Sequence, residues 1–173
     1  MKNKLMLLLF VLVFADYAFA QNSETTDEQM ENLEIKDKFA LSFNLGGNTG
    51  GSQANKLYST NIGVDISLLK GISKNLMVGG NVGAGNAFSK KGSTEGDLKY
   101  LMIGASFRLY TDNNKFFIGG NGGYSFGLDD GGWYYQPRFG FDVCEHFGVN
   151  VSYLEINDAI AFSAVTVGLE YSF

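Results

Sequence analysis

The chain has 173 residues, enough for one domain. Charged residues make up only 18% of it, below the quarter typical of soluble domains. The chain therefore has too few charges for the charged surface that keeps an ordinary soluble domain in water. The 23 Gly, the 14% aromatic content and the single Pro favour strands and open turns over helices. The net charge of −5 argues against nucleic acid as a partner, because binding to phosphates relies on positive charge.

The first twenty residues are predicted to be a secretory signal peptide. Lys2 and Lys4 form a basic start, Leu5 to Phe14 is an unbroken apolar run, and Ala18-Phe19-Ala20 is a small-residue cleavage site. The apolar run is too short to cross a membrane as a helix. We expect the mature chain to begin at Gln21, with no Cys after the site to carry a lipid anchor.

Residues 21–38 are acidic and polar. Their thin apolar content predicts a flexible periplasmic leader, with room for a brief helix at its start.

From Phe39 onward the hydrophobic pattern has a period of two, which is typical of strands with two distinct faces. We identify eight such runs: residues 39–45, 62–68, 76–85, 101–110, 116–126, 133–143, 147–153 and 165–173. The connections 70–75, 111–115 and 144–146 are short, whereas 46–57, 86–96, 127–131 and 154–159 are mostly longer and polar or glycine-rich. Short turns at one end and larger loops at the other are typical of an outer-membrane barrel. An even strand count places both mature termini in the periplasm.

The chemistry of the two faces distinguishes a membrane barrel from a soluble one. The outer face of a soluble barrel should be rich in Lys, Glu and Thr. Here the polar face is mostly Gly, Ser and Asn, which suits the crowded lumen of an eight-stranded barrel. The apolar face is rich in aromatic residues toward both strand ends, as interfacial girdles are: Trp133 and Tyr135 near the long loops, and Phe116, Phe147, Tyr171 and Phe173 near the short turns. The sequence therefore predicts an all-β, eight-stranded antiparallel up-and-down transmembrane β-barrel.

Two residues interrupt the apolar face. Lys99 is its one clear charge, but it lies at a strand end, where its ammonium group can reach water. A charge at the lipid midplane would cost about 2–4 kcal/mol. Pro137 lies in the middle of a run and cannot donate to the ladder, so a bulge or locally broken pairing is expected there.

Five charged residues fall on the lumen face: Asp65, Arg108, Arg138, Asp142 and Glu170. Buried charges must be paired in an interior of low dielectric constant. We therefore expect a salt-bridge network that closes the lumen. The alternative is a gated pore that conducts small solutes.

The C-terminal residues Gly168-Leu169-Glu170-Tyr171-Ser172-Phe173 match the G-x-x-aromatic-x-aromatic ending of outer-membrane barrels. With the signal peptide and the strand pattern, the chain resembles the small eight-stranded family of the outer membrane protein A transmembrane domain and the opacity and attachment-invasion barrels. The resemblance implies a bacterial outer-membrane location. It also implies that the barrel-assembly machinery reads Gly168, Tyr171 and Phe173 as a signal, although a last strand with aromatic anchors explains the same residues.

Catalysis finds little support in the sequence. Barrel enzymes of this size that act on lipid A typically use a His with a Ser and a carboxylate, and the one histidine, His146, falls in a short turn. Cys144 is the single cysteine and fits a small residue near a turn. The residues form no metal-ligand cluster or phosphate-binding loop, so no metal or other cofactor is expected.

The polar loops around residues 48–58 and 89–97 are where an extracellular ligand would bind. The sequence thus favours a structural or surface-interaction role, with a porin-like channel second and a lipid A-modifying enzyme third. The expected partners are outer-membrane lipid, lipopolysaccharide and the assembly machinery.

Overall fold

The computed structural model describes residues 37–49, 57–93, 96–112, 114–127, 131–157 and 161–173. The predicted signal peptide, residues 21–36 of the predicted leader and the middle of several long loops lie outside these residues. Among the residues described, no helix has the length and apolar character to cross a membrane.

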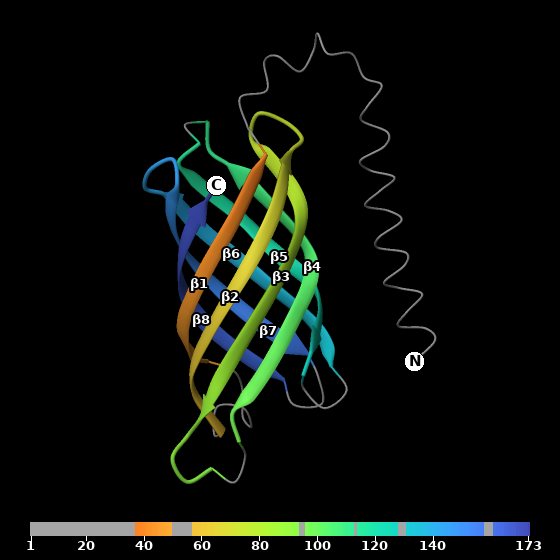
Figure 1. Ribbon diagram of the computed structural model, residues 1–173, viewed down its shortest axis with the longest axis vertical. Helices are drawn as coiled ribbons and strands as arrows, with labels where there is room; N and C mark the ends of the chain where they lie inside the picture. Colours follow the sequence, from red (N-terminus) through yellow and green to blue (C-terminus); the bar gives the residue numbers. More distant parts are fainter. Residues whose placement is uncertain (1–36, 50–56, 94–95, 113, 128–130, 158–160) are drawn as a thin grey trace, which may run out of the picture. The chain divides into compact units, whose positions relative to one another are not determined.

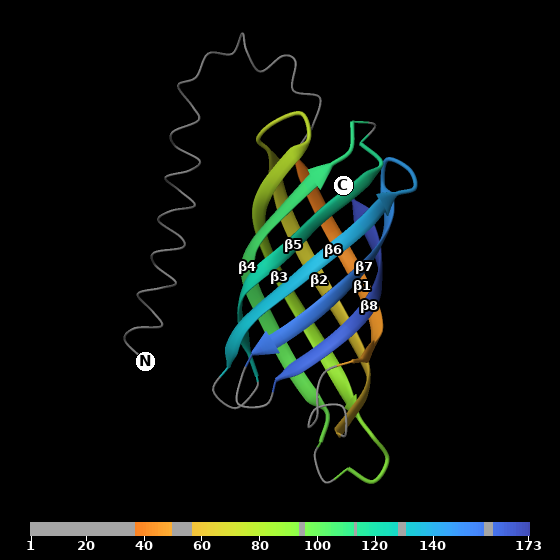
Figure 2. The ribbon, with the colours of Figure 1, turned by 180° about the vertical axis from the view of Figure 1, so that it is seen from behind.

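Eight antiparallel strands form a closed barrel in chain order (Figures 1 and 2). They are β1 (Lys38–Asn48), β2 (Tyr58–Gly71), β3 (Leu76–Ser89), β4 (Leu98–Tyr110), β5 (Phe116–Phe126), β6 (Gly132–Asp142), β7 (Phe147–Asn157) and β8 (Phe162–Ser172). Each strand pairs with its neighbours in the chain, and β8 pairs with β1 to close the wall. The prediction of an eight-stranded all-β barrel is confirmed.

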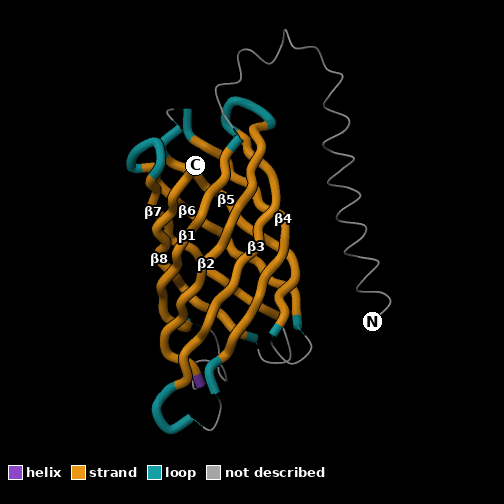
Figure 3. Tube along the Cα trace, viewed as in Figure 1, coloured by secondary structure: helices purple, strands orange, loops and turns teal. Residues whose placement is uncertain are grey.

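The two ends of the barrel differ (Figure 3). The short connections 72–75, 111–115 and 143–146 lie at one end, together with the C-terminus, and we call this the turn end. At the other end, which we call the loop end, β1, β3, β5 and β7 finish and β2, β4, β6 and β8 begin. β3 and β7 continue several residues into segments predicted as loops, so Glu155 becomes a second charge at an outward position near the loop end. β1 begins one residue early, at Lys38, which the sequence had assigned to the leader.

The wall has an apolar outside and a polar inside. Outward side chains such as Leu68 and Leu169 are each 62% exposed, whereas inward Asp65 and Arg108 are each 2% exposed. Apolar side chains cover the outer wall on every strand, an exposed area far beyond what monomeric soluble proteins carry. The lipid-facing and lumen-facing sets predicted from the alternation are therefore confirmed.

Pro137 interrupts the ladder locally. Pairing between β6 and β7 runs as far as Tyr135 and Glu155, and it resumes at Arg138 and Ser152 in the same register. The missing N–H of the proline removes a ladder bond without inserting a residue. Of the two predicted outcomes, broken pairing occurs and a bulge does not.

The lumen is filled with apolar side chains at both ends. The loop-end cluster contains Tyr58, Ala87, Tyr100, Met102, Tyr134, Leu154, Ile156, Phe162 and Ala164. The turn-end cluster contains Leu69, Met77, Tyr110 and Phe117. Most of the polar side chains described next occupy the space between the two clusters, and Lys38 and Asp142 reach the rim at the turn end.

Candidate functional site: the lumen network

Arg108 and Glu170 form a buried ion pair across the lumen. Arg108, near the end of β4, donates two parallel hydrogen bonds to the Glu170 carboxylate of β8, from Nη1 to Oε1 at 2.6 Å and from Nη2 to Oε2 at 2.7 Å. Ser42 donates a third bond to Oε2 at 3.1 Å. The guanidinium also lies 4.6 Å from the centre of the Phe117 ring. Bidentate geometry of this kind fixes both side chains as well as attracting them.

Lys38 joins this pair to the rim at the turn end. Its Nζ lies 3.2 Å from Glu170 Oε1 and 3.0 Å from Asp142 Oδ2, and it donates to the Tyr110 hydroxyl at 3.2 Å. Lys38 was not predicted as a lumen residue, because the acidic segment 21–38 that ends with it was assigned to the leader. Its parity with Ala40 and Ser42, which both face inward, was the signal that could have found it.

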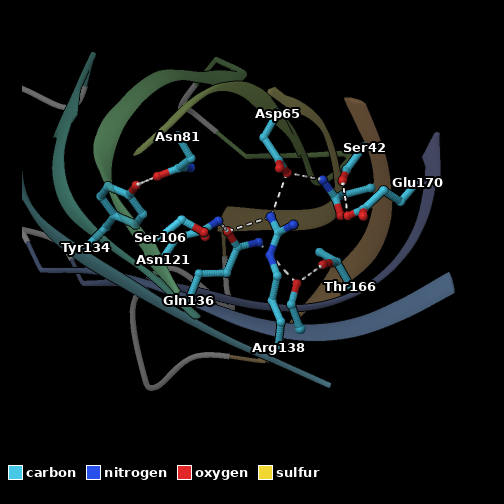
Figure 4. A network of polar contacts seen from close by, with 12 residues as sticks. Ser42, Asp65, Asn81, Ser106, Asn121, Tyr134, Gln136, Arg138, Thr166 and Glu170 are labelled. Atoms are coloured by element: carbon cyan, nitrogen blue, oxygen red, sulfur yellow. Dashed lines mark hydrogen bonds and ion pairs between the residues drawn. The ribbon is translucent and has the colours of Figure 1, made fainter. Parts of the chain in front are cut away.

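Arg138 and Asp65 form the second buried pair, in the middle of the lumen (Figure 4). Arg138 Nη2 lies 2.6 Å from Asp65 Oδ2, and Asn44 Nδ2 donates to the same oxygen at 2.6 Å. Arg138 Nη2 also donates to Gln136 Oε1 at 2.9 Å. Together with Lys38, the five predicted charges thus supply three cations and three carboxylates, and the lumen network carries no net charge.

Neutral side chains extend the network around the wall. The Asn121 amide lies 2.7 Å from Ser106 Oγ and 3.1 Å from Gln136 Oε1. Gln136 Nε2 donates to Ser152 Oγ at 3.1 Å, and that hydroxyl lies 2.7 Å from Thr166 Oγ1. Two phenols of the loop-end cluster bind lumen amides as separate pairs: Tyr134 donates to Asn81 and Tyr100 donates to Asn61, each at 2.8 Å.

The network leaves some of its buried atoms without a protein partner. They include Arg138 Nε and Nη1, Asp65 Oδ1, Asp142 Oδ1, Asn44 Oδ1 and both amide atoms of Asn150. A cavity of about 10 Å³, lined in part by Asn44, Asp65 and Gln136, has room for about one water molecule. Donors and acceptors mixed around so little space are suited to water rather than to an organic ligand.

The three residues of the C-terminal motif have two separate environments. Gly168 faces the lumen, where an added Cβ would meet Asn44 Oδ1 at 2.5 Å and the Asn150 amide at 2.7 and 2.8 Å. Tyr171 and Phe173 face outward, and their rings lie 4.8 Å apart. The Phe173 ring also lies 5.0 Å from that of Phe39, so the end of β8 is packed against the start of β1.

His146 and Cys144 lie outside the lumen, in the exposed turn between β6 and β7. His146 Nδ1 lies 2.9 Å from the Ser172 carbonyl oxygen, and its ring stacks on Tyr171 at 5.8 Å. These contacts fasten the turn to β8. Within the described ranges, no group of three or more His, Cys, Asp or Glu is placed to hold a metal ion.

Comparisons with known proteins agree with this architecture. No protein-family model and no curated protein matches the chain. The outer membrane protein Ail of Yersinia pestis, in a phospholipid bilayer nanodisc, is 16% identical with a TM-score of 0.53, over 80% of this chain and 100% of that one. The crystal structure of Ail, the attachment invasion locus protein, gives 14% identity and a TM-score of 0.56 over 79% and 98%.

A de novo designed transmembrane β-barrel is 15% identical, with a TM-score of 0.54 over 81% of this chain and 98% of the design. At identities this low, the likeness concerns the fold. The chain therefore has the fold of the small eight-stranded transmembrane β-barrels, as the resemblance in the sequence implied.

Proposed function

We propose that this chain is an integral outer-membrane protein with a structural or surface-interaction role, a closed lumen and no catalysis. The observation that carries the proposal is the way the lumen is filled. Each of its three cations lies within 3.2 Å of a carboxylate, and apolar clusters occupy both ends. A solute would have to part ion pairs and displace buried aromatic rings to pass.

The outer-membrane location and the surface role draw support from the neighbours. Ail is named as an outer membrane protein and as an attachment invasion locus protein. By analogy, the loop end would face the cell exterior, where the loops bind an extracellular ligand. The turn end would face the periplasm. Further partners would be the barrel-assembly machinery and the membrane lipids, lipopolysaccharide among them.

The single cysteine offers a test of this orientation. Cys144 is exposed in a turn-end connection. A membrane-impermeant maleimide should leave it unlabelled in intact cells and label it once the outer membrane is permeabilised. Lys91→Cys in a Cys144→Ser background, at the loop end, should label in intact cells. The opposite pattern would reverse the proposed topology.

Conductance in a planar bilayer tests the closed lumen. The purified mature chain should show no large steady conductance. Arg138→Ala should admit brief small currents, because it removes the side chain that fills the centre of the lumen. The control, Lys74→Ala in an exposed turn, should behave like the wild type. A large constitutive conductance of the wild type would refute the closed lumen and favour a porin-like channel. The buried polar atoms without a partner around Arg138 are the observation that favours the porin-like channel as a second candidate.

A lipid A-modifying activity is the third candidate, and it has the weakest structural support. His146 contacts a backbone carbonyl and an aromatic ring in a turn-end connection. Lipid A from a deletion strain should be unchanged in mass. A loss of one acyl or headgroup modification in that strain would overturn the non-catalytic assignment.

A further inference from the structure

The outer wall carries a groove at the loop-end half of the barrel. Its volume is about 560 Å³, within the range of small-ligand sites. Five directly paired outward residues cross it from β1 to β5: Phe43, Val64, Ala84, Leu101 and Phe126. Ala84 is the smallest of the row and forms the floor, while the larger residues on either side form the walls. The groove thus arises from one small side chain among large ones.

One end of the groove is polar. Asn86 and Lys99 are paired across β3 and β4, both face outward, and both line the groove next to Ala84 and Leu101 on the loop-end side. Within the described part of the chain, Lys99 forms no ion pair. Asp97 lies close enough to interact with its charge, but the Asp97 oxygens accept hydrogen bonds from Ser89 N–H and Asn86 Nδ2.

We propose that this groove binds an acyl chain of a phosphate-bearing membrane lipid, with the phosphate on Lys99. The groove and such a lipid are polar at the same end. The apolar part of the groove is open to the bilayer and suits the acyl chain, and the cation of Lys99, where the strand meets water, suits the phosphate. Lysine binds phosphate as a compact point charge. The inference rests on the transmembrane fold and is independent of whether the lumen conducts or which end faces outward.

Native mass spectrometry of the purified mature chain in detergent provides the test. The probes are phosphatidylglycerol and a diacylglycerol with the same acyl chains. The wild type should retain one phosphatidylglycerol per barrel and bind it more tightly than diacylglycerol. Excess inorganic phosphate should not displace it, since free phosphate lacks the acyl chain. Displacement by inorganic phosphate alone would overturn the lipid assignment.

Two pairs of variants separate the parts of the site. Lys99→Gln should weaken phosphatidylglycerol about fivefold and leave diacylglycerol unchanged, as expected for one lysine near a lipid phosphate. Ala84→Leu fills the floor and should weaken both lipids at least as much. The controls are Lys74→Gln, in an exposed turn, and Ala105→Leu, at an outward position of β4 outside the groove; neither should change binding.

Heat-modifiable migration on a gel establishes that each variant is folded before titration, and Ala84→Val replaces Ala84→Leu if the larger side chain prevents folding. Equal lipid binding by Ala84→Leu and Ala105→Leu would overturn the assignment of the groove as the lipid site. Equal weakening of both lipids by Lys99→Gln would overturn the phosphate contact.

Discussion

Arg108 and Glu170 connect opposite walls of the barrel. They come from β4 and β8, which are not neighbours in the closed sheet, and share two hydrogen bonds of 2.6 and 2.7 Å. Each side chain is 2% exposed. Because the lumen excludes water from both partners, the Arg108 charge depends on Glu170, whose carboxylate also contacts Lys38. The pair therefore fixes the spacing of the two walls as well as neutralising their charges.

Removing one member of this pair should be strongly destabilising. Glu170→Gln leaves Arg108 and Lys38 without their shared carboxylate, so we expect a loss of about 3–5 kcal/mol in the free energy of unfolding. Glu145→Gln, in the exposed turn, is the matched control and should change it by less than about 0.5 kcal/mol. Urea unfolding of the barrel in lipid vesicles measures both. A double Arg108→Met, Glu170→Gln variant should be more stable than the single Glu170→Gln variant, and if it is less stable the buried charge is not the cause.

Two adjacent glycines of β1 should respond very differently to alanine. Gly46 faces the lumen, where an added Cβ would collide with the backbone carbonyl of Val165 and lie 2.7 Å from Thr166 Cα. Gly47 faces outward, and the nearest atom to its Cβ is 4.0 Å away. Gly46→Ala should cost about 1–3 kcal/mol, because backbone must move, and Gly47→Ala should be within about 0.5 kcal/mol of the wild type. Equal effects on the urea midpoint would contradict the close packing of β1 on β8.

Acid should loosen the connection between β3 and β4. Two hydrogen bonds hold the pKa of the Asp97 carboxyl below its usual range. The bond from the Ser89 N–H has the larger effect and the bond from the Asn86 amide the smaller one. A lowered pKa in the folded state means that this carboxylate stabilises the connection above its ordinary pKa. The stabilisation is lost as the pH falls through the lowered value. Hydrogen-exchange protection of the Ser89 amide, followed by NMR, should therefore fall in acid, and Asp97→Asn should abolish that pH dependence.

The sequence was most informative where side chains alternate without interruption. The run from Phe39 to Leu45 predicted its strand and both faces, because lipid and lumen impose opposite chemistry on alternate positions. The alternation fails at the loop end, where Phe162, Ser163 and Ala164 are all buried, so β8 began earlier than predicted. Glu155 was not predicted as an outward charge, because the predicted strand ended at residue 153 and β7 continues to Asn157.

Which lumen charges meet could not be predicted from spacing along the chain. Asp65 contacts Arg138, and Glu170 contacts Arg108, across the barrel rather than between neighbouring strands. Those pairings depend on the tilt and stagger of the strands, which arise only when the sheet closes. The sequence therefore identified the charged residues but neither their partners nor the contribution of Lys38.

Deleting Phe173 should separate assembly from stability. Its ring lies against those of Phe39 and Tyr171, its N–H donates to the Phe39 carbonyl at 2.9 Å, and its side chain is 67% exposed to the lipid. The deletion removes contacts only at the rim, so the purified variant should refold in detergent with a heat-modifiable shift on a gel. If the assembly machinery reads the terminal aromatic residue, insertion in cells should nevertheless fall severalfold. Phe39→Ala removes the same ring contact from the neighbouring strand β1 and should insert normally. Unchanged insertion of the deletion variant, or an equal loss in Phe39→Ala, would reduce Phe173 to an aromatic anchor of the last strand.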